Sequence, residues 1–224
     1  MILKIHFNGS NEPFKTVYLN KQVNGFVNKL LGDASGEYHG KMSDYSVSCI
    51  QGWNREGDSF FFKNGAVVVI SSPNVKFIGK LVEGILMKRA SNIMGLKYSH
   101  YEVGTFDVHK KFDLIRTSSP LRVSGKNRTM LTFDDDEFLD VLNKKSVSKL
   151  IAAGVDEKDA NSVKIDFFHK EGAKKFYVKI GSSVHLCTKA MFVVSGSKNA
   201  RTALYEMGLG NATGFGFGSV SINK

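Results

Sequence analysis

The chain has 224 residues, of which 42% are hydrophobic, so it can bury a sizeable core and is long enough for one large or two small domains. Thirty-one lysines and arginines against 21 aspartates and glutamates give a formal net charge of +10, which favours an anionic partner, nucleic acid before a membrane surface. The longest strongly apolar run, residues 66–70, is too short to span a bilayer, and the first residues alternate like a strand, which is not the pattern of a signal peptide. The two cysteines fit neither a disulfide framework nor a zinc-binding motif. We therefore expect a folded cytoplasmic protein with both thiols reduced.

In the first half of the chain, apolar residues recur with the periods of alternating strands and helices. The pattern predicts strands at 2–7, 45–51, 59–62, 66–71 and 97–108, and helices at 20–31 and 74–90. The strands at 59–62 and 66–71 are joined by Lys63-Asn64-Gly65 and are expected to form a hairpin. This order of strands and helices is that of a ferredoxin-like domain.

The same order recurs in the second half of the chain. It predicts strands at 113–122, 163–167, 176–180 and 184–194, one helix after the acidic run at 134–137, and another at 197–207. Ser197 is expected to cap the last helix and Gly208 to end it in a left-handed conformation. We therefore predict an α+β protein of two tandem ferredoxin-like domains, residues 1–111 and 112–224, joined at Lys110-Lys111-Phe112.

Five of the 22 glycines gather in GLGNATGFGFG, from Gly208 to Gly218. They follow a helix, unlike a dinucleotide-binding fingerprint, and they lack the Lys-Ser/Thr of a phosphate-binding P-loop. The GFGF centre is shared with the octapeptide of the RNA-recognition motif, but the few residues after it do not supply the helix and strand which that motif requires. The alternation of glycine and phenylalanine at 214–218 predicts a strand with one bare face, on which either a helix packs or a polyanion lies against exposed amides.

A double ferredoxin-like chain that ends in a helix, this glycine-rich loop and a strand resembles the CRISPR-associated endoribonucleases of the RAMP superfamily, which cut repeat transcripts into guide RNAs. Three further stretches agree with that family: Tyr38–Gly52 with its histidine-bearing loop and second strand, Ser118–Val123 with the start of its second domain, and Met130–Lys145 with the following helix. The family's glycine loop contacts RNA, so the resemblance implies RNA contacts at Gly208, Gly210, Gly214, Gly216 and Gly218. It implies CRISPR repeat RNA as the partner, and leaves other effector subunits and a second copy of the chain open as further partners.

The resemblance also implies a reaction in which the RNA supplies its own nucleophile. The ribose 2′-hydroxyl attacks the neighbouring phosphorus and leaves a 2′,3′-cyclic phosphate and a 5′-hydroxyl, so neither a metal nor a cofactor is expected. The protein must transfer protons and stabilise charge on the pentavalent phosphorus. His39, in a polar loop flanked by glycines, is the candidate for proton transfer, with Lys41 beside the phosphorus and Tyr38 either orienting the phosphate or packing under the loop.

Basic side chains in the second half are candidates for phosphate contact, although each taken singly is more often a solvated surface charge. They are Arg122, Lys126, Arg128, Lys174, Lys175, Lys179, Lys198 and Arg201. Two other functions stay open on the sequence. One is a non-catalytic RNA-binding subunit of an RNA-guided complex, and the other is an enzyme that holds a nucleotide phosphate with the glycines.

Overall fold

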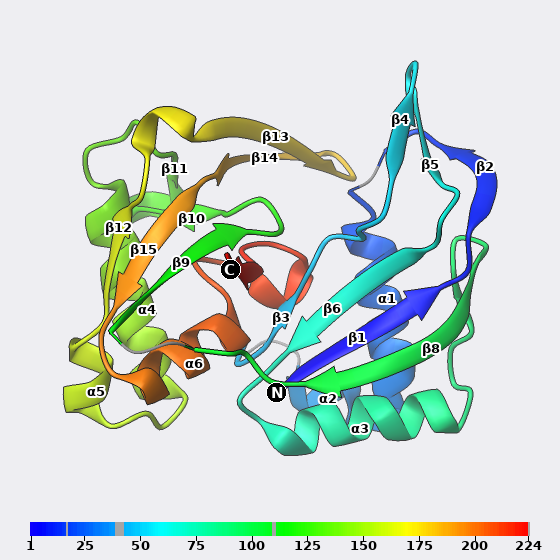
Figure 1. Ribbon diagram of the computed structural model, residues 1–224, viewed down its shortest axis with the longest axis horizontal. Coiled ribbons are helices and arrows are strands. Elements are labelled where there is room, and N and C mark those ends of the chain that lie inside the picture. Colours follow the sequence, from blue (N-terminus) through cyan, green and yellow to red (C-terminus); the bar gives the residue numbers. More distant parts are fainter. Residues whose placement is uncertain (17, 39–42, 109–110, 224) are drawn as a thin grey trace.

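The computed structural model describes residues 1–16, 18–38, 43–108 and 111–223. Figure 1 shows two units of sheet and helix side by side, with the C-terminal segment, in red, between them. Each unit has its own hydrophobic core, one built from residues between Leu3 and Leu96 and the other from residues between Val108 and Val220. The exact boundary at 111 and 112 stays a prediction. None of the described helices is both long and apolar enough to cross a membrane.

The N-terminal sheet is antiparallel, with the strand order β3-β6-β1-β8-β7. Its strands are β1 (Ile2–Phe7), β3 (Ser46–Val47), β6 (Ala66–Ser71), β7 (Asn92–Ile93) and β8 (Leu96–Gly104). Alternate residues of β1, namely Leu3, Ile5 and Phe7, are buried in one core with residues of α1 (Asn20–Leu31) and α3 (Val75–Leu86). The other face of the sheet is therefore free of these helices.

The predicted hairpin between 59–62 and 66–71 is wrong. β5 (Ser59–Phe62) pairs instead with β2 (Ser10–Phe14) and β4 (Asn54–Glu56) in a separate three-stranded sheet, which projects from the molecule in Figure 1. Phe62 is buried against Phe14 of β2, with ring centroids 5.1 Å apart, and this contact holds β5 away from the main sheet. The turn at Lys63-Asn64-Gly65 thus joins two sheets.

The C-terminal sheet has the order β12-β15-β9-β16, which matches β3-β6-β1-β8 of the N-terminal sheet strand for strand. Its strands are β9 (Phe112–Thr117), β12 (Lys164–Phe167), β15 (Met191–Ser195) and β16 (Val220–Ile222), and its helices are α4 (Phe138–Ala152), α5 (Glu157–Asn161) and α6 (Lys198–Met207). The Ser197 side chain accepts a hydrogen bond from the Ala200 amide at 3.2 Å, so the predicted helix cap is confirmed. Both units are ferredoxin-like, as the sequence predicts.

Shorter elements lie in the connections within the two units. They are α2 (Ser35–Tyr38), the pair β10 (Val123–Ser124) and β11 (Met130–Leu131), and single 3₁₀ turns at Gly32–Ala34, Lys126–Arg128, Lys170–Gly172 and Thr213–Phe215. A long hairpin, β13 (Lys174–Ile180) and β14 (Ser183–Lys189), reaches across the top of the molecule in Figure 1 toward the N-terminal unit. Val178 and Cys187 of this hairpin form a small third core with Phe217, against which Tyr18 of the N-terminal half packs.

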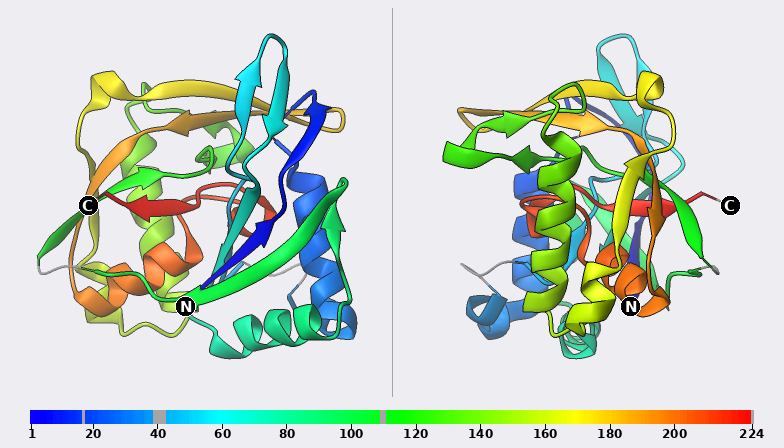
Figure 2. Two further views of the ribbon diagram at one scale, coloured as in Figure 1. Left: turned by 45° about the vertical axis from the view of Figure 1, so that its right-hand side comes forward. Right: turned by 90° about the vertical axis from the view of Figure 1, so that its left-hand side faces the viewer.

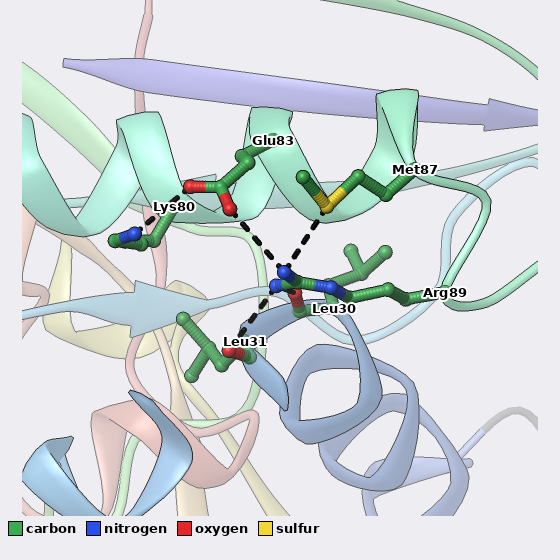
Figure 3. Close-up of polar contacts among 6 residues, drawn as sticks. All are labelled: Leu30, Leu31, Lys80, Glu83, Met87 and Arg89. Carbon is green, nitrogen blue, oxygen red and sulfur yellow. Dashed lines mark hydrogen bonds and ion pairs between the residues drawn. The ribbon is translucent and has the colours of Figure 1, made fainter. Parts of the chain in front are cut away.

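Helices α1 and α3 approach each other closely at the end of α1. A Cβ atom at Gly84 of α3 would overlap the Leu30 carbonyl of α1, so only glycine permits this distance. Figure 3 shows how Arg89 completes the contact: its guanidinium donates to the carbonyls of Leu30 and Leu31, at 3.2 and 3.5 Å, and pairs with Glu83 at 3.2 Å. A cation at the carboxyl end of a helix is favourable, and this one fixes the point from which the chain leaves α1.

Replacing Gly84 with alanine should lower the free energy of unfolding by about 1 to 3 kcal/mol, because the added methyl group forces the two helices apart. Gly79 provides the matched control on the same helix, since an added Cβ meets no atom there. Gly79→Ala should be neutral or stabilise the protein by up to about 1 kcal/mol through helix propensity. Urea unfolding of the two variants tests this contrast, and equal free energies would contradict the close approach.

Candidate functional site

The predicted catalytic residues His39 and Lys41 lie outside the described residues, but both ends of their loop are placed. The Tyr38 ring meets Phe77 of α3 edge to face, with centroids 4.8 Å apart. Tyr45, beyond the loop, stacks on the same Phe77 ring with centroids 4.4 Å apart. Phe77 is fully buried, so it anchors the loop where the chain enters and where it leaves.

Tyr38 is half-buried at the start of this loop, and its environment decides what its hydroxyl can do. Burial raises the pKa of Tyr38, and the negative charges of Glu37 and Asp44 raise it further against the opposing effect of Lys80. The phenol therefore stays protonated at neutral pH. It can donate a hydrogen bond to a phosphate oxygen, but it does not serve as a base.

A hollow of about 540 Å³ lies beside the loop, between the two units. Its described lining comes from Glu37, Tyr38, Ser43, Asp44, Pro73 and Asn74 on one side and from Ala152 and Ala153 at the end of α4 on the other. The backbone carbonyl of Asp44 accepts from the Ser72 hydroxyl at 2.9 Å, and its carboxylate accepts from the Asn74 amide at 3.3 Å. Two carboxylates and no cation are thus found among the described residues that line the hollow.

The glycine-rich segment does not form the strand that the Gly-Phe alternation predicts. Residues Thr213–Phe215 make a 3₁₀ turn, Gly216 and Gly218 have φ of +87° and +61°, and β16 begins only at Val220. Positive φ values break the extended backbone that an alternating strand requires. The predicted left-handed backbone at Gly208 has the expected sign of φ, at +72°, but its ψ of 168° is that of an extended residue.

Protein atoms, rather than open space, occupy the surfaces that these glycines leave bare. A Cβ at Gly214 would lie 2.7 Å from the Tyr45 ring, and one at Gly208 would lie 2.9 Å from the Ser46 hydroxyl. Added Cβ atoms at Gly210, Gly216 and Gly218 would overlap Arg122, Asn20 and Leu209. Figure 1 and the left view of Figure 2 show this red segment between the two units. Close packing therefore explains why these positions are glycines. RNA contact remains a prediction, and of the five glycines only Gly210 is half-buried, whereas the other four are buried.

Side chains from both units hold this segment in place. On the N-terminal side, Asn20 and Asn24 of α1 donate to the carbonyls of Phe215 and Gly214, at 2.7 and 3.3 Å. On the C-terminal side, the backbone amide of Asn211 donates to the Arg122 carbonyl at 2.8 Å. The segment is thus part of the junction between the units and lies directly beside Ser43 and Tyr45, where the loop at 39–42 ends.

Lys149 of α4 is the centre of this junction. Its ammonium group is buried and donates to the carbonyls of Met207 and Gly208, at 2.6 and 3.2 Å, and to the Thr213 hydroxyl at 2.8 Å. The Thr213 hydroxyl in turn donates to the Tyr45 carbonyl at 2.9 Å. Burial lowers the pKa of Lys149 to about 7, while the Asp44 carboxylate opposes this shift.

A second and larger hollow, of about 810 Å³, forms a cleft between the open faces of the two sheets. Lys4 of β1 reaches it from the N-terminal sheet, Arg116 of β9 from the C-terminal sheet, and Lys174 and Lys189 from the β13–β14 hairpin. Asp107 contributes a carboxylate to the lining. Two sheet faces with an excess of cations between them form a concave surface suited to an anionic chain.

Only one of the eight predicted RNA-binding cations, Lys174, lies in this cleft. Lys126 and Arg128 are exposed on their own 3₁₀ turn, Lys179 is exposed on the outer side of β13, and Lys198 is exposed in the first turn of α6. Arg122 is half-buried beneath the hairpin, and Lys175 pairs with Asp134 at 2.6 Å. The structure therefore distributes these side chains over several surfaces.

The prediction that Arg201 contacts RNA is wrong, because its side chain is fully buried. Its guanidinium pairs with the equally buried Asp113 of β9 and donates to the Gly196 carbonyl at 3.1 Å. The Tyr205 hydroxyl also donates to Asp113, at 3.0 Å. A buried arginine paired in this way holds α6 on the sheet and does not reach a surface ligand.

Three of the four cleft cations, Lys4, Arg116 and Lys189, were not among the predicted binding residues. Lys4 and Arg116 occupy the positions of β1 and β9 that alternate with core residues such as Ile5 and Ile115. This alternation is visible in the sequence. What the sequence does not show is that the open faces of the two sheets lie opposite each other, and that arrangement makes these cations neighbours.

Comparison with known proteins agrees with the fold. The family model described as CRISPR associated protein Cas6, C-terminal, matches residues 105–222, just over half of the chain. No curated protein matches the sequence. Among solved structures, the chain is similar to one described as an RAMP protein binding different RNA substrates, with a TM-score of 0.82 and 20% identity over 100% of both chains.

Two further structures are similar over nearly their whole length. One, from Pyrococcus furiosus, is described as Cas6-related and has a TM-score of 0.79 and 20% identity, over 100% of this chain and 98% of that one. The other is a Cas6 product complex with a TM-score of 0.65 and 10% identity over 99% of both chains. At these identities, the likeness shows the fold alone.

The Lys149 junction predicts a pH dependence of stability. Between about pH 7 and the ordinary lysine value of 10.5, the unfolded chain keeps a proton on Lys149 that the folded protein loses. Lys149 should therefore make the free energy of unfolding rise with pH in this window, by up to about 1.4 kcal/mol per unit. Lys149→Met should remove that rise, and it should lower stability by about 1 to 3 kcal/mol because the buried acceptors lose their donor.

Urea unfolding at several pH values between about 7 and 9.5 measures both effects. Lys144→Met, at an exposed position of the same helix, is the control and should follow the wild type. Parallel pH profiles for the wild type and Lys149→Met would show that Lys149 is not the titrating group.

Proposed function

Because the chain belongs to the family of CRISPR associated protein Cas6, we propose that it is an endoribonuclease that cuts CRISPR repeat RNA to produce guide RNAs. The family match over residues 105–222 carries this proposal. The tandem ferredoxin-like fold and the basic cleft between its sheets support it, since RNA needs an extended cationic surface. One of the similar solved structures is a product complex, and we extend that kind of activity to this chain.

The cleft is the proposed path of the RNA backbone. Lys4 and Arg116 face it from opposite sheets, and Lys174 and Lys189 close it from the hairpin. These side chains would replace the counterions of several phosphates, which supplies affinity without selecting a sequence. The exposed Lys179 and Tyr177 on the outer side of β13 extend the basic and aromatic surface beyond the cleft.

The proposed chemistry takes place at the loop held by Phe77. The RNA 2′-hydroxyl attacks the adjacent phosphorus, and His39 transfers a proton to or from one of the two reacting oxygens. Tyr38, which stays protonated, would donate a hydrogen bond to a phosphate oxygen, and Lys41 would stabilise the charge that develops there. Asp44, next to the loop, is held by Ser72 and Asn74. No metal ion takes part in this scheme.

A non-catalytic RNA-binding subunit is the second candidate. The observation in its favour is the hollow beside the loop, whose described lining carries the carboxylates of Glu37 and Asp44 without a cation. Carboxylates repel a phosphate unless Lys41 offsets them. Incubation with labelled repeat RNA in EDTA separates the candidates: cleavage supports the nuclease, and retention without cleavage supports the subunit.

Binding to the cleft should depend strongly on salt. The RNA used is a repeat RNA with a 2′-deoxy nucleotide at the cut site, which prevents cleavage during the measurement. The affinity of the wild type for this RNA should fall steeply between about 50 and 200 mM salt. The double variant Lys4→Ala/Arg116→Ala should reduce the slope of log affinity against log salt by about 0.7 for each lost phosphate contact. Fluorescence anisotropy measures both quantities. Lys144→Ala/Lys158→Ala removes the same charge from α4 and α5, outside the cleft lining, and should leave the slope unchanged. Equal slopes for the two double variants would place the RNA elsewhere.

Cleavage should depend on His39 and on the RNA's own hydroxyl. His39→Ala should slow cleavage by about 10²- to 10⁴-fold, the usual loss on removing a general acid or base, with little change in binding. A single 2′-deoxy substitution at the cut site should abolish cleavage by the wild type, and EDTA should leave the wild-type rate unchanged. The assay is quantitative cleavage with end-group analysis, and His169→Ala, at an exposed position, is the control.

Two results would contradict this mechanism. Full activity of His39→Ala would remove His39 from it. Cleavage of the 2′-deoxy RNA at the same bond would show that the RNA does not supply the nucleophile.

A further inference from the structure

Two histidines and a glutamate lie together on the open face of the N-terminal sheet. His6 of β1 is directly opposite His100 of β8, and their rings stack with centroids 4.2 Å apart. Glu102, two residues beyond His100, approaches His6, with its Oε1 atom 3.3 Å from the His6 Nε2 atom. One potential ligand atom from each of these side chains lies within 4.8 Å of the others.

The local backbone explains how the two strands bring these groups together. The register between β1 and β8 shifts after His6, because Phe7 pairs with Tyr98 and leaves Ser99 as an extra residue. This bulge changes the alternation of β8 so that Tyr98 and Tyr101 pack against the core while His100 and Glu102 are exposed. A bulge that redirects side chains in this way is a common device beside binding sites.

The three side chains are also partly oriented for a metal ion. Ser99 lies 3.1 Å from Nδ1 of His100, so this nitrogen is engaged and Nε2 is left as the ligand atom. The Nε2 atom of His6 is buried, and its 3.3 Å contact with Glu102 Oε1 does not have the geometry of a hydrogen bond. Lys4 donates to the other Glu102 oxygen, Oε2, at 3.2 Å, and this contact holds the carboxylate with its Oε1 atom toward His6.

We propose that His6, His100 and Glu102 bind one divalent transition-metal ion of the zinc type, with a fourth position open to solvent. Two imidazoles and a carboxylate are a frequent ligand set for an open zinc site. Bond lengths of 2.0–2.2 Å place ligand atoms of a tetrahedral ion about 3.3 Å apart. The two rings are now stacked nearly parallel, at 6°, so the exposed His100 ring must rotate out of this stack before its Nε2 atom and that of His6 can point at one ion. Hard oxygen-seeking ions such as magnesium would not select this set.

This ion is separate from the proposed cleavage chemistry. The loop at 39–42 is anchored by Phe77 of α3, on the face of the sheet that holds the helices. His6 alternates with Ile5 and Phe7 of the core and therefore lies on the opposite face. An ion bound there would link β1 to β8 and would stabilise the folded state, because the unfolded chain does not hold the three ligands together.

The test uses tag-free, full-length protein that has been stripped with a chelator and dialysed. Titration calorimetry with Zn²⁺ should show one equivalent bound per chain, and Zn²⁺ should raise the melting temperature. Co²⁺ should give the visible absorption of a four-coordinate site with nitrogen and oxygen ligands. Glu102→Gln and His100→Ala should each lower the Zn²⁺ affinity at least about tenfold, because even residues that only hydrogen-bond to a metal ligand cost that much when they are replaced. Both variants should also lose most of the rise in melting temperature.

His169→Ala is the matched control. His169 lies 3.0 Å from Glu171, so it forms a histidine–glutamate pair like that of His6 and Glu102 but without a second histidine. Because such a pair lacks a third ligand, His169→Ala should bind Zn²⁺ like the wild type. His100 and Glu102 are exposed, so their variants should keep the fold, and circular dichroism verifies this. The proposal is overturned if the wild type binds no stoichiometric Zn²⁺, or if both folded variants bind it as tightly as the wild type.

Discussion

The arrangement of the two halves of the molecule depends on one buried ammonium group, that of Lys149. Its three hydrogen bonds join α4 to the end of α6 and to Thr213, and the Thr213 hydroxyl continues the chain of contacts to Tyr45 in the N-terminal unit. Two of the acceptors, the carbonyls of Met207 and Gly208, are at the carboxyl end of α6, where the helix dipole favours a cation. This environment offsets only part of the cost of burying the charge, and the remainder lowers the pKa of Lys149 to about 7.

The glycine-rich segment can occupy this junction only because it lacks side chains. Its backbone must pass between Tyr45 and Ser46 on one side and Arg122 on the other, at distances that leave no room for a Cβ atom. At Gly218 it also folds back onto the carbonyl of its own Leu209. The same contacts fix Tyr45, and Tyr45 stacks on Phe77, which also holds Tyr38. Tyr38 and Tyr45, at the two ends of the loop, are therefore coupled to packing at the junction, some 170 residues away in the sequence.

Periodicity predicted most of the fold, because each ferredoxin-like unit is built from local patterns. The bounds of β1 and α1 and the Ser197 cap agree with the sequence prediction almost residue for residue. Local patterns failed where a distant contact decides the outcome. Phe14 draws β5 out of the main sheet, Lys149 and Asn20 bend the glycine segment into a turn, and Asp113 draws Arg201 into the core.

The candidate site has two parts, the loop that carries His39 and the basic cleft, and the sequence predicted them to different degrees. Single loop residues could be named only through the family resemblance, and for His39 and Lys41 that prediction stands untested. The basic cleft has a physical signal in the sequence, the polar positions of β1 and β9, but a charged residue on a strand face is usually solvated. Only the opposition of the two sheets turns Lys4 and Arg116 into parts of one surface.

The same geometry constrains how one RNA could use both parts of the site. The cleft lies on the open face of the N-terminal sheet, whereas the loop is anchored by Phe77 among the helices of the other face. At the β3 edge of that sheet, the 3₁₀ turn Thr213–Phe215 packs against β3 and α1. An RNA held in the cleft and cut at the loop would therefore have to reach from one face of the N-terminal sheet to the other. Binding and cleavage would then involve separate stretches of the same RNA, so loss of cleft cations should weaken capture without altering the chemistry at the loop.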